Sequence, residues 1–173
     1  VVSYALEILE QHPELRLFIN LAGTSLNNEG VLEFIEKELF HRNVKPSQLC
    51  FEITETSVVK DAHMAEKWIR RIRELGCQFA LDDFGVGFSS FSYLRLLPVD
   101  YVKVDGSFIK NIENDPTKQA IVKAVSSIAK TLNKKTVAEF VEHKCAVKIL
   151  EDLEIDFGQG YYLGKPEPYE IFF

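Results

Sequence analysis

The sequence predicts an α/β fold in which parallel strands alternate with helices. Short β-branched or aromatic runs are followed by helix-length amphipathic segments along all 173 residues, without a long linker or a composition shift. Such alternation is typical of repeated βα units. A doubly wound sheet and a barrel both fit it. The placement of polar residues favours the barrel, because they recur at the carboxyl end of each strand run, and a barrel gathers those ends on one face.

Six buried strands are predicted from the apolar runs. They cover residues 15–21, 48–54, 77–84, 101–105, 135–141 and 156–163. Helix-length amphipathic segments lie among them at residues 29–42, 61–75, 116–132 and 143–153. Asn27 and Asn28 are good N-cap residues for the first helix. Gly76 is a typical C-terminal glycine for the second, and Asp115 precedes a proline at the start of the third.

Composition limits the class of protein. Hydrophobic residues make up 46% and charged residues 27% of the chain, which is ordinary for one globular domain. The net charge is −6, and the densest basic stretch, residues 67–71, is interleaved with apolar residues on a predicted helix. We therefore expect no binding to long nucleic acid, which requires a basic face. No apolar run approaches the ~18 residues of a membrane span, and the first residues show no export signal.

The three cysteines, Cys50, Cys77 and Cys145, are far apart and form no Cys-x-x-Cys pair. Cys50 and Cys77 lie in apolar runs, so buried free thiols are favoured over a disulfide, a zinc site or a nucleophile. Free thiols fit a reducing cytoplasm, where we expect this domain to lie even if other domains anchor the parent protein in a membrane.

Polar residues that are costly to bury recur where the predicted strands end. They are Asn20, Glu52, Glu55, Asp82, Asp83, Lys103, Asp105, Glu139, Glu142 and Gln159. One such acid beside a strand is usually explained by a turn or a cap. Repetition on six successive strands is different, because unpaired buried charges cost several kcal/mol each. A ring of acids at one end of a barrel predicts shared cations.

The Asp82–Asp83 pair is the centre of this pattern. Side chains alternate along a regular strand, so both acids can serve one site only if the backbone turns where the strand ends. Hard oxygen ligands suit Mg²⁺ or Mn²⁺ rather than zinc, and two such ions are a known arrangement for phosphoester hydrolysis. Lys103 would add a fixed positive charge near the nucleophile or phosphate.

A glycine- and serine-rich segment, residues 84–94, follows the acid pair. It contains Gly85 and Gly87, and the hydroxyl groups of Ser89, Ser90 and Ser92. A structural turn would also explain a lone Gly-x-Gly. Beside two metal-binding acids, we interpret this segment as an active-site loop.

Taken in order, these segments resemble the motifs of EAL domains, the cyclic di-GMP phosphodiesterases of bacterial signalling. INLAG (19–23) resembles the family's Asn-Leu-Ser strand, FEITET (51–56) its Glu-x-Thr-Glu motif, and ALDDFGVGFSSFSYL (80–94) its Asp-Asp-Phe-Gly loop. VDYVKVDGSF (99–108) is similar to Lys-Ile-Asp-Arg-Ser-Phe, VAEFVE (137–142) to Ala-Glu-Gly-Val-Glu, and QGYYLGKP (159–166) to the closing Gln-Gly-Tyr motif. The resemblance implies a TIM-like (β/α)8 barrel.

The resemblance also implies a role for each site residue. Asn20, Glu52 and Asp82 would hold the first metal ion, and Asp82, Asp83 and Glu139 the second, each ion being Mg²⁺ or Mn²⁺. Lys103 would orient the attacking water, with Glu142 and Gln159 supporting the site. Glu55 would anchor the loop between Gly85 and Leu94. The family's reaction opens one phosphodiester of cyclic di-GMP and gives linear pGpG.

This chain departs from the family pattern in several places. It has no Glu-Ala-Leu motif, so residues 1–173 are expected to be an EAL domain without its first two barrel strands and one metal-ligand glutamate, and inactive by themselves. Ala22 stands where the family has serine and Val86 where it has threonine. Gly106 stands where the family has arginine. Phe140 stands where it has glycine, and the bulk of this side chain is expected to affect the positions of Glu139 and Glu142.

Three functions fit these observations. The first is a working phosphodiesterase, favoured because the other metal and water-positioning residues are present. The second is a non-catalytic receptor for cyclic di-GMP, and the third is a structural or dimerising relic. From the family alone we expect a homodimer and fusion to sensory or GGDEF-type domains. The four histidines lack ligand spacing, and we expect surface roles for them.

Overall fold

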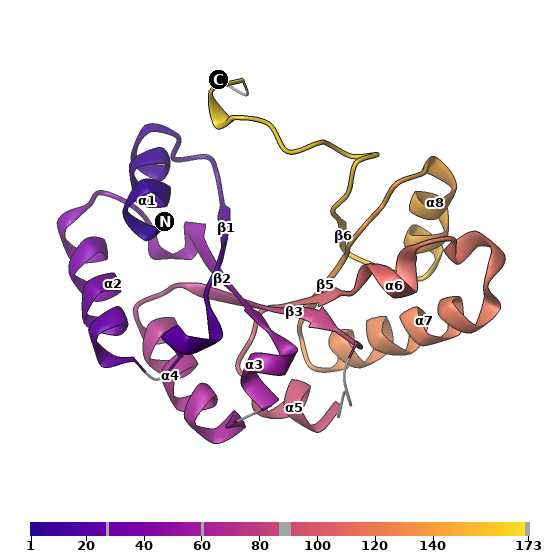
Figure 1. Ribbon diagram of the computed structural model, residues 1–173, viewed down its shortest axis with the longest axis horizontal. Helices are drawn as coiled ribbons and strands as arrows, with labels where there is room; N and C mark the ends of the chain where they lie inside the picture. Colours follow the sequence, from indigo (N-terminus) through magenta and orange to yellow (C-terminus); the bar gives the residue numbers. More distant parts are fainter. Residues whose placement is uncertain (27, 60, 87–90, 172–173) are drawn as a thin grey trace. The chain divides into compact units, whose positions relative to one another are not determined.

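The computed structural model describes residues 1–26, 28–59, 61–86 and 91–171 (Figure 1). The chain divides into two compact units, residues 1–101 and 102–173, and each combines parallel strands with helices. Among the described residues no helix is long and apolar enough to cross a membrane.

The first unit is built on three parallel strands in sequence order: β1 (Leu17–Asn20), β2 (Leu49–Thr54) and β3 (Gln78–Phe84) (Figure 1). Its helices are α1 (Val2–Gln11), α2 (Glu29–His41), α3 (Glu55–Val59), α4 (Ala62–Glu74) and α5 (Phe91–Leu96). Two 3-10 turns, η1 (Gly23–Ser25) and η2 (Pro46–Gln48), complete the connections. The connections from β1 to β2 and from β2 to β3 each contain a long helix, as parallel pairing requires.

Alternation along β2 and β3 separates an apolar face from a polar one. Phe51 and Phe79 are fully buried, with ring centroids 5.6 Å apart, and Trp68 of α4 meets Phe79 edge-on at 6.4 Å. Fully burying one such phenylalanine stabilises the fold by about 2–3 kcal/mol. Glu52 follows Phe51, so its side chain projects from the opposite side of the sheet. The apolar face builds the core, and the other face carries the acids.

The second unit contains β4 (Tyr101–Val104), whose first residue belongs to the first unit, β5 (Lys135–Ala138) and β6 (Phe157–Gly158). Its helices are α6 (Gly106–Ile109), α7 (Pro116–Thr131) and α8 (Lys144–Asp152), with 3-10 turns η3 (Ile112–Asn114) and η4 (Tyr169–Ile171). The strands β5 and β6 pair in parallel, Val137 opposite Phe157. The amide of Glu139 donates to the carbonyl of Val104, which joins the end of β5 to β4.

The four predicted helices are present, and the predicted caps at Asn28, Gly76 and Asp115 are confirmed. The Asn28 carboxamide accepts from the amides of Gly30 and Val31, and the Asp115 carboxylate accepts from those of Thr117 and Lys118. Gly76 adopts a φ of +98° after α4. Caps of this kind contribute about 1 kcal/mol each. Asn27, the other predicted cap residue, lies outside the described residues.

Two predicted strands are too long. The run 135–141 ends as a strand at Ala138, because Phe140 adopts a left-handed φ of +53°. The run 156–163 forms a strand only at Phe157–Gly158. There the chain turns at Gly160, where an added Cβ would lie 2.2 Å from the amide nitrogen of Val141. The other four runs are confirmed with ends that differ by no more than two residues.

The thiols of Cys50 and Cys77 are free and buried, as predicted, and Cys145 is exposed. Burial raises the pKa of the Cys77 thiol to about 12. Burial also raises the pKa of Cys50, and the nearby carboxylates of Glu52 and Asp100 raise it further.

Candidate functional site

The carboxyl ends of β1, β2 and β3 carry the predicted metal ligands of the first unit. Asn20 stands opposite Glu52 in the register between β1 and β2, and Glu52 stands opposite Ala80 of β3. Asp82 lies two residues beyond Ala80, so it projects from the same face of the sheet as Asn20 and Glu52. Glu52 is only 7% exposed. The register therefore brings an amide and two carboxylates to one face of the first unit.

The Asp82–Asp83 pair converges because the backbone leaves the regular strand conformation. Asp83 has a φ of +56°, a left-handed conformation that non-glycine residues adopt at a cost of about 1–3 kcal/mol. One carboxylate oxygen of Asp82 and one of Asp83 lie within 4.8 Å of each other. On a regular strand the two side chains would point to opposite faces. The turn that the two adjacent acids require is therefore present at Asp83.

Glu55 connects the start of α3 to the segment that follows β3. Its side chain is buried, and its Oε2 accepts a hydrogen bond of 3.2 Å from the amide of Gly85. Gly85 adopts a φ of +110°. This hydrogen bond joins Glu55 to the first residue of the glycine- and serine-rich segment, and the anchoring role of Glu55 stays a prediction. Gly87, Ser89 and Ser90 of that loop lie outside the described residues, and α5 begins after them at Phe91.

In the second unit a buried ion pair joins the ends of β4 and β5. The Lys103 ammonium lies 2.9 Å from Oε1 of Glu139, and the two residues are 3% and 9% exposed. Removing one member of such a pair leaves an uncompensated buried charge and costs about 3–5 kcal/mol. The pair fixes a cation and an anion side by side at the strand ends.

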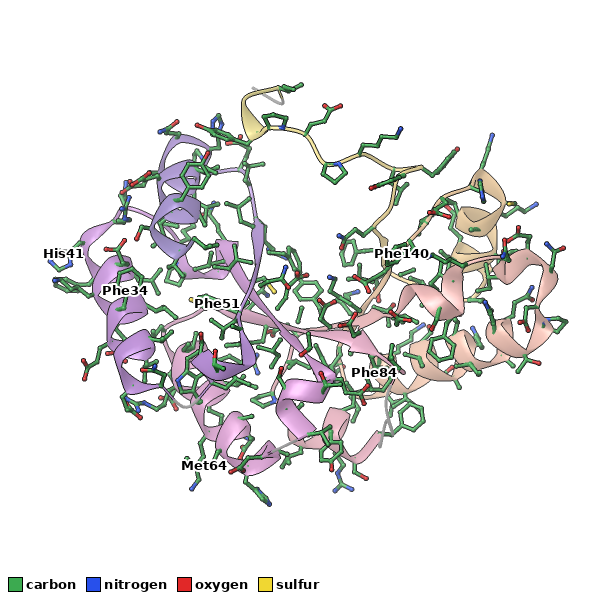
Figure 2. All side chains as sticks on the ribbon, viewed as in Figure 1. Phe34, His41, Phe51, Met64, Phe84 and Phe140 are labelled. Carbon is green, nitrogen blue, oxygen red and sulfur yellow. The ribbon has the colours of Figure 1, made fainter. Side chains whose placement is uncertain are left out.

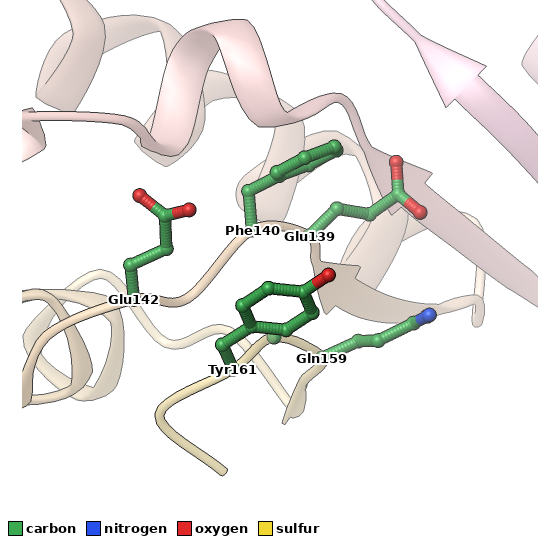
Figure 3. Close-up of a pocket in the computed structure, with 6 residues that line it drawn as sticks. Glu139, Phe140, Glu142, Gln159 and Tyr161 are labelled. Atoms are coloured by element: carbon green, nitrogen blue, oxygen red, sulfur yellow. The ribbon is translucent and has the colours of Figure 1, made fainter. Parts of the chain in front are cut away.

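A pocket of about 270 Å³ has Glu139, the acidic member of this ion pair, in its lining (Figure 3). It is lined by Glu139, Phe140, Glu142, Gln159, Gly160 and Tyr161. The structure thus brings together three predicted residues of the second unit, Glu139, Glu142 and Gln159. Gly160 contributes backbone atoms to the lining, and it packs so closely on the backbone of Val141 that no side chain would fit there.

Besides Gly160, two aromatic residues line this pocket that were not predicted to do so. Phe140 was expected only to affect the positions of its neighbouring glutamates, and Tyr161 was assigned no role. The sequence signal was the aromatic residue in the Gln-Gly-Tyr motif, together with the two replacements at 106 and 140. The structure links those replacements, because a Cβ at Gly106 would lie 2.1 Å from Cδ2 of Phe140.

The donor set of the first unit suits a hard divalent cation. Glu52, Asp82 and Asp83 offer carboxylate oxygens, and Asn20 offers an amide oxygen, which are the ligands that Mg²⁺ and Mn²⁺ prefer. Two carboxylates held within 4.8 Å repel each other unless a cation or a proton lies between them. The residues present therefore fit the metal ions that the family resemblance implies.

The comparisons with known proteins agree on one class. The model of the EAL domain family matches residues 1–166. The chain therefore belongs to the EAL domain family. The cyclic di-GMP phosphodiesterase PdeB of Shewanella oneidensis is 45% identical over 150 residues, and PdeA of Borreliella burgdorferi is 39% identical over the same length. These alignments cover 87% of this chain but only 18% and 22% of those proteins, so the chain spans about one fifth of their length.

Solved EAL structures show the same fold. The PaMucR phosphodiesterase in its c-di-GMP complex has a TM-score of 0.92 and 30% identity, over 99% of this chain and 72% of that one. The FimX EAL domain from Pseudomonas aeruginosa, bound to c-di-GMP, has a TM-score of 0.90 and 28% identity, over 96% and 68%. This likeness confirms the predicted α/β, TIM-like fold class.

Proposed function

We propose that this domain hydrolyses cyclic di-GMP to linear pGpG in a metal-dependent reaction. The observation that carries the proposal is the convergence of Asp82 and Asp83 at a strained backbone position. Strain of this kind persists only where the surroundings impose it, and it clusters at functional sites. The choice of reaction is supported by two further facts. The chain belongs to the EAL family, and its relatives PdeB and PdeA are named as cyclic di-GMP phosphodiesterases.

The metal ligands in this proposal are those that the family motifs place here. Asn20, Glu52 and Asp82 would hold one Mg²⁺ or Mn²⁺, and Asp82, Asp83 and Glu139 a second. When bound, the ions lower the pKa of water and neutralise charge on the phosphodiester. The register of Asn20 with Glu52, and the approach of Asp82 to Asp83, support the first unit's part of this assignment.

Lys103 supplies the positive charge that does not depend on a metal. Its ammonium is buried and held by Glu139, so it is fixed in place before substrate arrives. A fixed cation of this kind orients a water molecule and stabilises negative charge on phosphate oxygens. Glu142 and Gln159, which line the pocket beside Glu139, support that arrangement.

The reaction consumes one water molecule and breaks one bond. Water adds to phosphorus, and the bond between that phosphorus and the 3′ oxygen breaks, so the phosphate remains on the 5′ carbon. The 3′ oxygen takes up a proton, and the second phosphodiester stays intact. The product is the linear dinucleotide pGpG.

Turnover assays on the whole protein test this proposal. We expect pGpG to appear when cyclic di-GMP is incubated with the protein and Mg²⁺ or Mn²⁺, and not after chelation by EDTA. Chromatography separates the substrate from the product. Binding of cyclic di-GMP without formation of pGpG in either metal would contradict the enzymatic function.

That contradicting outcome defines the second candidate, a non-catalytic receptor for cyclic di-GMP. Phe140 favours it, because a phenylalanine stands between Glu139 and Glu142, where the family has a glycine. The structure of the FimX EAL domain bound to c-di-GMP shows that the fold can hold this ligand. Isothermal titration with cyclic di-GMP, run beside the turnover assay, separates the two functions.

We further propose that the whole protein works in the cytoplasm, as a homodimer through this domain, with sensory or GGDEF-type domains on the same chain. One relative, MucR of Pseudomonas aeruginosa, is named as bifunctional diguanylate cyclase and cyclic di-GMP phosphodiesterase. The free buried thiols Cys50 and Cys77 fit a reducing compartment. Light scattering of the purified protein tests the dimer, and a monomeric mass would contradict it.

A further inference from the structure

Asp156 and Thr136 hydrogen-bond to each other at the amino ends of β6 and β5. Asp156 directly precedes β6, and Thr136 is the second residue of β5. Oδ2 of Asp156 accepts from the amide of Thr136 at 2.9 Å and from its hydroxyl at 3.0 Å. The amide of Asp156 donates to the same hydroxyl oxygen at 3.0 Å. These hydrogen bonds join two residues that lie 20 positions apart in the chain.

The carboxylate of Asp156 is an ionised acceptor near neutral pH. Partial burial by itself would raise its pKa, but hydrogen bonds from the Lys135 ammonium and from the amide and hydroxyl of Thr136 lower the pKa overall. Thr136 is only 1% exposed. Without the carboxylate, a buried amide and a buried hydroxyl would lose the acceptor that they have here, which is costly inside a protein.

The register between β5 and β6 depends on this contact, because β6 is very short. It consists of Phe157 and Gly158 alone, which stand opposite Val137 and Ala138. Two such pairs resist slippage weakly, and a shift by one residue would turn each side chain to the other face of the sheet. Asp156 binds at the position immediately before these pairs and so determines which residues face each other.

This register brings Gln159 level with Glu139, one position beyond the two strands. The amide of Gln159 donates to the carbonyl of Ala138 at 2.8 Å, so the pairing continues to that point. Figure 3 shows the side chains of Glu139 and Gln159 extending in the same direction from their two segments. Glu139 also holds the Lys103 ammonium. A slip of β6 would therefore change the surroundings of a carboxylate that the proposed function makes a metal ligand.

We propose that Asp156 and Thr136 are positioning residues, whose mutual hydrogen bonds fix Gln159 beside Glu139 and thereby raise the affinity of the site for a divalent cation. The inference rests on the proposed function, and it adds two residues at the opposite ends of the strands from the site. They act through the strand register and not by touching the ion or the substrate.

Binding of Mn²⁺ to the whole protein tests this inference without relying on turnover. Electron paramagnetic resonance measures the free ion and gives the dissociation constant. We expect Asp156→Ala to raise that constant by about tenfold, the low end of the range for groups that orient metal ligands. Thr136→Val removes the hydroxyl at nearly constant volume and should raise it in the same direction.

Conservative variants distinguish the hydrogen bonds from side-chain bulk. Asp156→Asn keeps an oxygen that accepts from Thr136, and Thr136→Ser keeps the hydroxyl. Both should bind Mn²⁺ within about threefold of wild type, since the ion pair with Lys135 that Asp156→Asn gives up is exposed and contributes little.

Asp115→Ala is the matched control for a loss of stability alone. The Asp115 carboxylate also accepts from two backbone amides, those of Thr117 and Lys118, but it caps α7 and does not join two strands. We expect this variant to unfold at a lower temperature, as loss of an N-cap does, and to bind Mn²⁺ within about twofold of wild type.

The outcomes separate this inference from the proposed function. An unchanged dissociation constant in Asp156→Ala would overturn the inference, and so would an equal rise in Asp115→Ala. If Asp156→Ala does not fold, the comparison of Thr136→Val with Thr136→Ser decides: equal constants overturn the inference, and a higher constant for the valine variant supports it. A wild-type protein that binds Mn²⁺ but forms no pGpG would reject the proposed reaction and leave the positioning role to these constants.

Discussion

At the residue scale, Asp83 shows how one dihedral angle builds a candidate metal site. A regular strand would place Asp82 and Asp83 on opposite faces of the sheet. The φ of +56° at Asp83 brings oxygen atoms of both side chains within 4.8 Å. Two carboxylates at that separation repel each other in the absence of a cation, so the local fold and the binding of a divalent ion stabilise each other.

Replacing Asp83 by asparagine distinguishes the role of this residue in the local fold from its role in binding a divalent ion. Asparagine tolerates left-handed backbone conformations, so we expect Asp83→Asn to leave the fold intact. Turnover of cyclic di-GMP should fall by more than about 100-fold, because Asp83 would hold a metal ion directly and even the outer partners of metal ligands are worth about 10- to 100-fold. Circular dichroism and pGpG production measure the two effects. A variant that unfolds would show that the pair is chiefly structural.

Variants of Lys103 and Glu139 distinguish the contribution of this ion pair to stability from its contribution to catalysis. Lys103→Met leaves the buried Glu139 carboxylate without its 2.9 Å partner, and we expect a loss of about 3–5 kcal/mol in the free energy of unfolding. The double variant Lys103→Met with Glu139→Gln removes both charges and should recover much of that stability. Neither variant should produce pGpG.

Urea denaturation and the turnover assay measure these outcomes. Recovery of turnover together with stability in the double variant would mean that the pair has no role in the reaction. An unchanged stability in the single variant would show that the Glu139 carboxylate finds a replacement partner.

At the element scale, the segment after β5 packs against the start of α6 because a large side chain at Phe140 meets a residue without a side chain at Gly106. The motif resemblance implies arginine and glycine where this chain has Gly106 and Phe140. Because a Cβ at 106 would lie 2.1 Å from the Phe140 ring, the two replacements depend on each other. Neither residue can be interpreted alone.

A double-mutant cycle measures this dependence. Gly106→Arg alone should destabilise the protein by about 1–3 kcal/mol through overpacking. Adding Phe140→Gly should relieve most of that loss, with a coupling energy of about 0.5–3 kcal/mol between neighbours. Thermal unfolding of the two single variants and the double variant gives the coupling. Additive losses would show that the ring moves aside freely.

Elements that depend on local sequence were predicted well. The caps at Asn28 and Asp115 and the apolar runs of β2 and β3 are local signals, and they are present in the structure. The helix α1 was not predicted as one, since its N-cap Val1 offers no side-chain hydrogen bond. The early end of β6 was missed as well, because it depends on the close approach of Gly160 to Val141, far away in sequence.

The candidate site likewise has features that the sequence predicts and features that depend on tertiary contacts. Motif spacing predicted which polar residues stand at the strand ends, and register places Asn20 beside Glu52. The strain at Phe140, its packing on Gly106 and the pocket it shares with Tyr161 are tertiary features that no spacing contains. Roles in catalysis stay predictions until the variants are measured.

At the scale of the whole molecule, the reactivity of the thiols measures how often the buried cysteines become accessible to solvent. Cys50 and Cys77 are buried, and the pKa of each is raised by burial, to about 12 for Cys77, so neither forms appreciable thiolate near neutral pH. Cys145 is exposed. For this part of the protein we expect one thiol to react with a disulfide reagent at about pH 8 and three to react in denaturant. Rapid reaction of all three without denaturant would show that the first unit opens readily.

The contact between Gly106 and Phe140 also has a consequence for the evolution of related domains. If a ring at position 140 leaves no room for a Cβ at position 106, the two positions should co-vary: relatives with an aromatic residue at the first should carry glycine at the second. A lineage that changes from arginine and glycine to the glycine and phenylalanine present here would meet a steric clash if phenylalanine at 140 arose first. The order of substitution is then constrained, glycine at 106 preceding phenylalanine at 140.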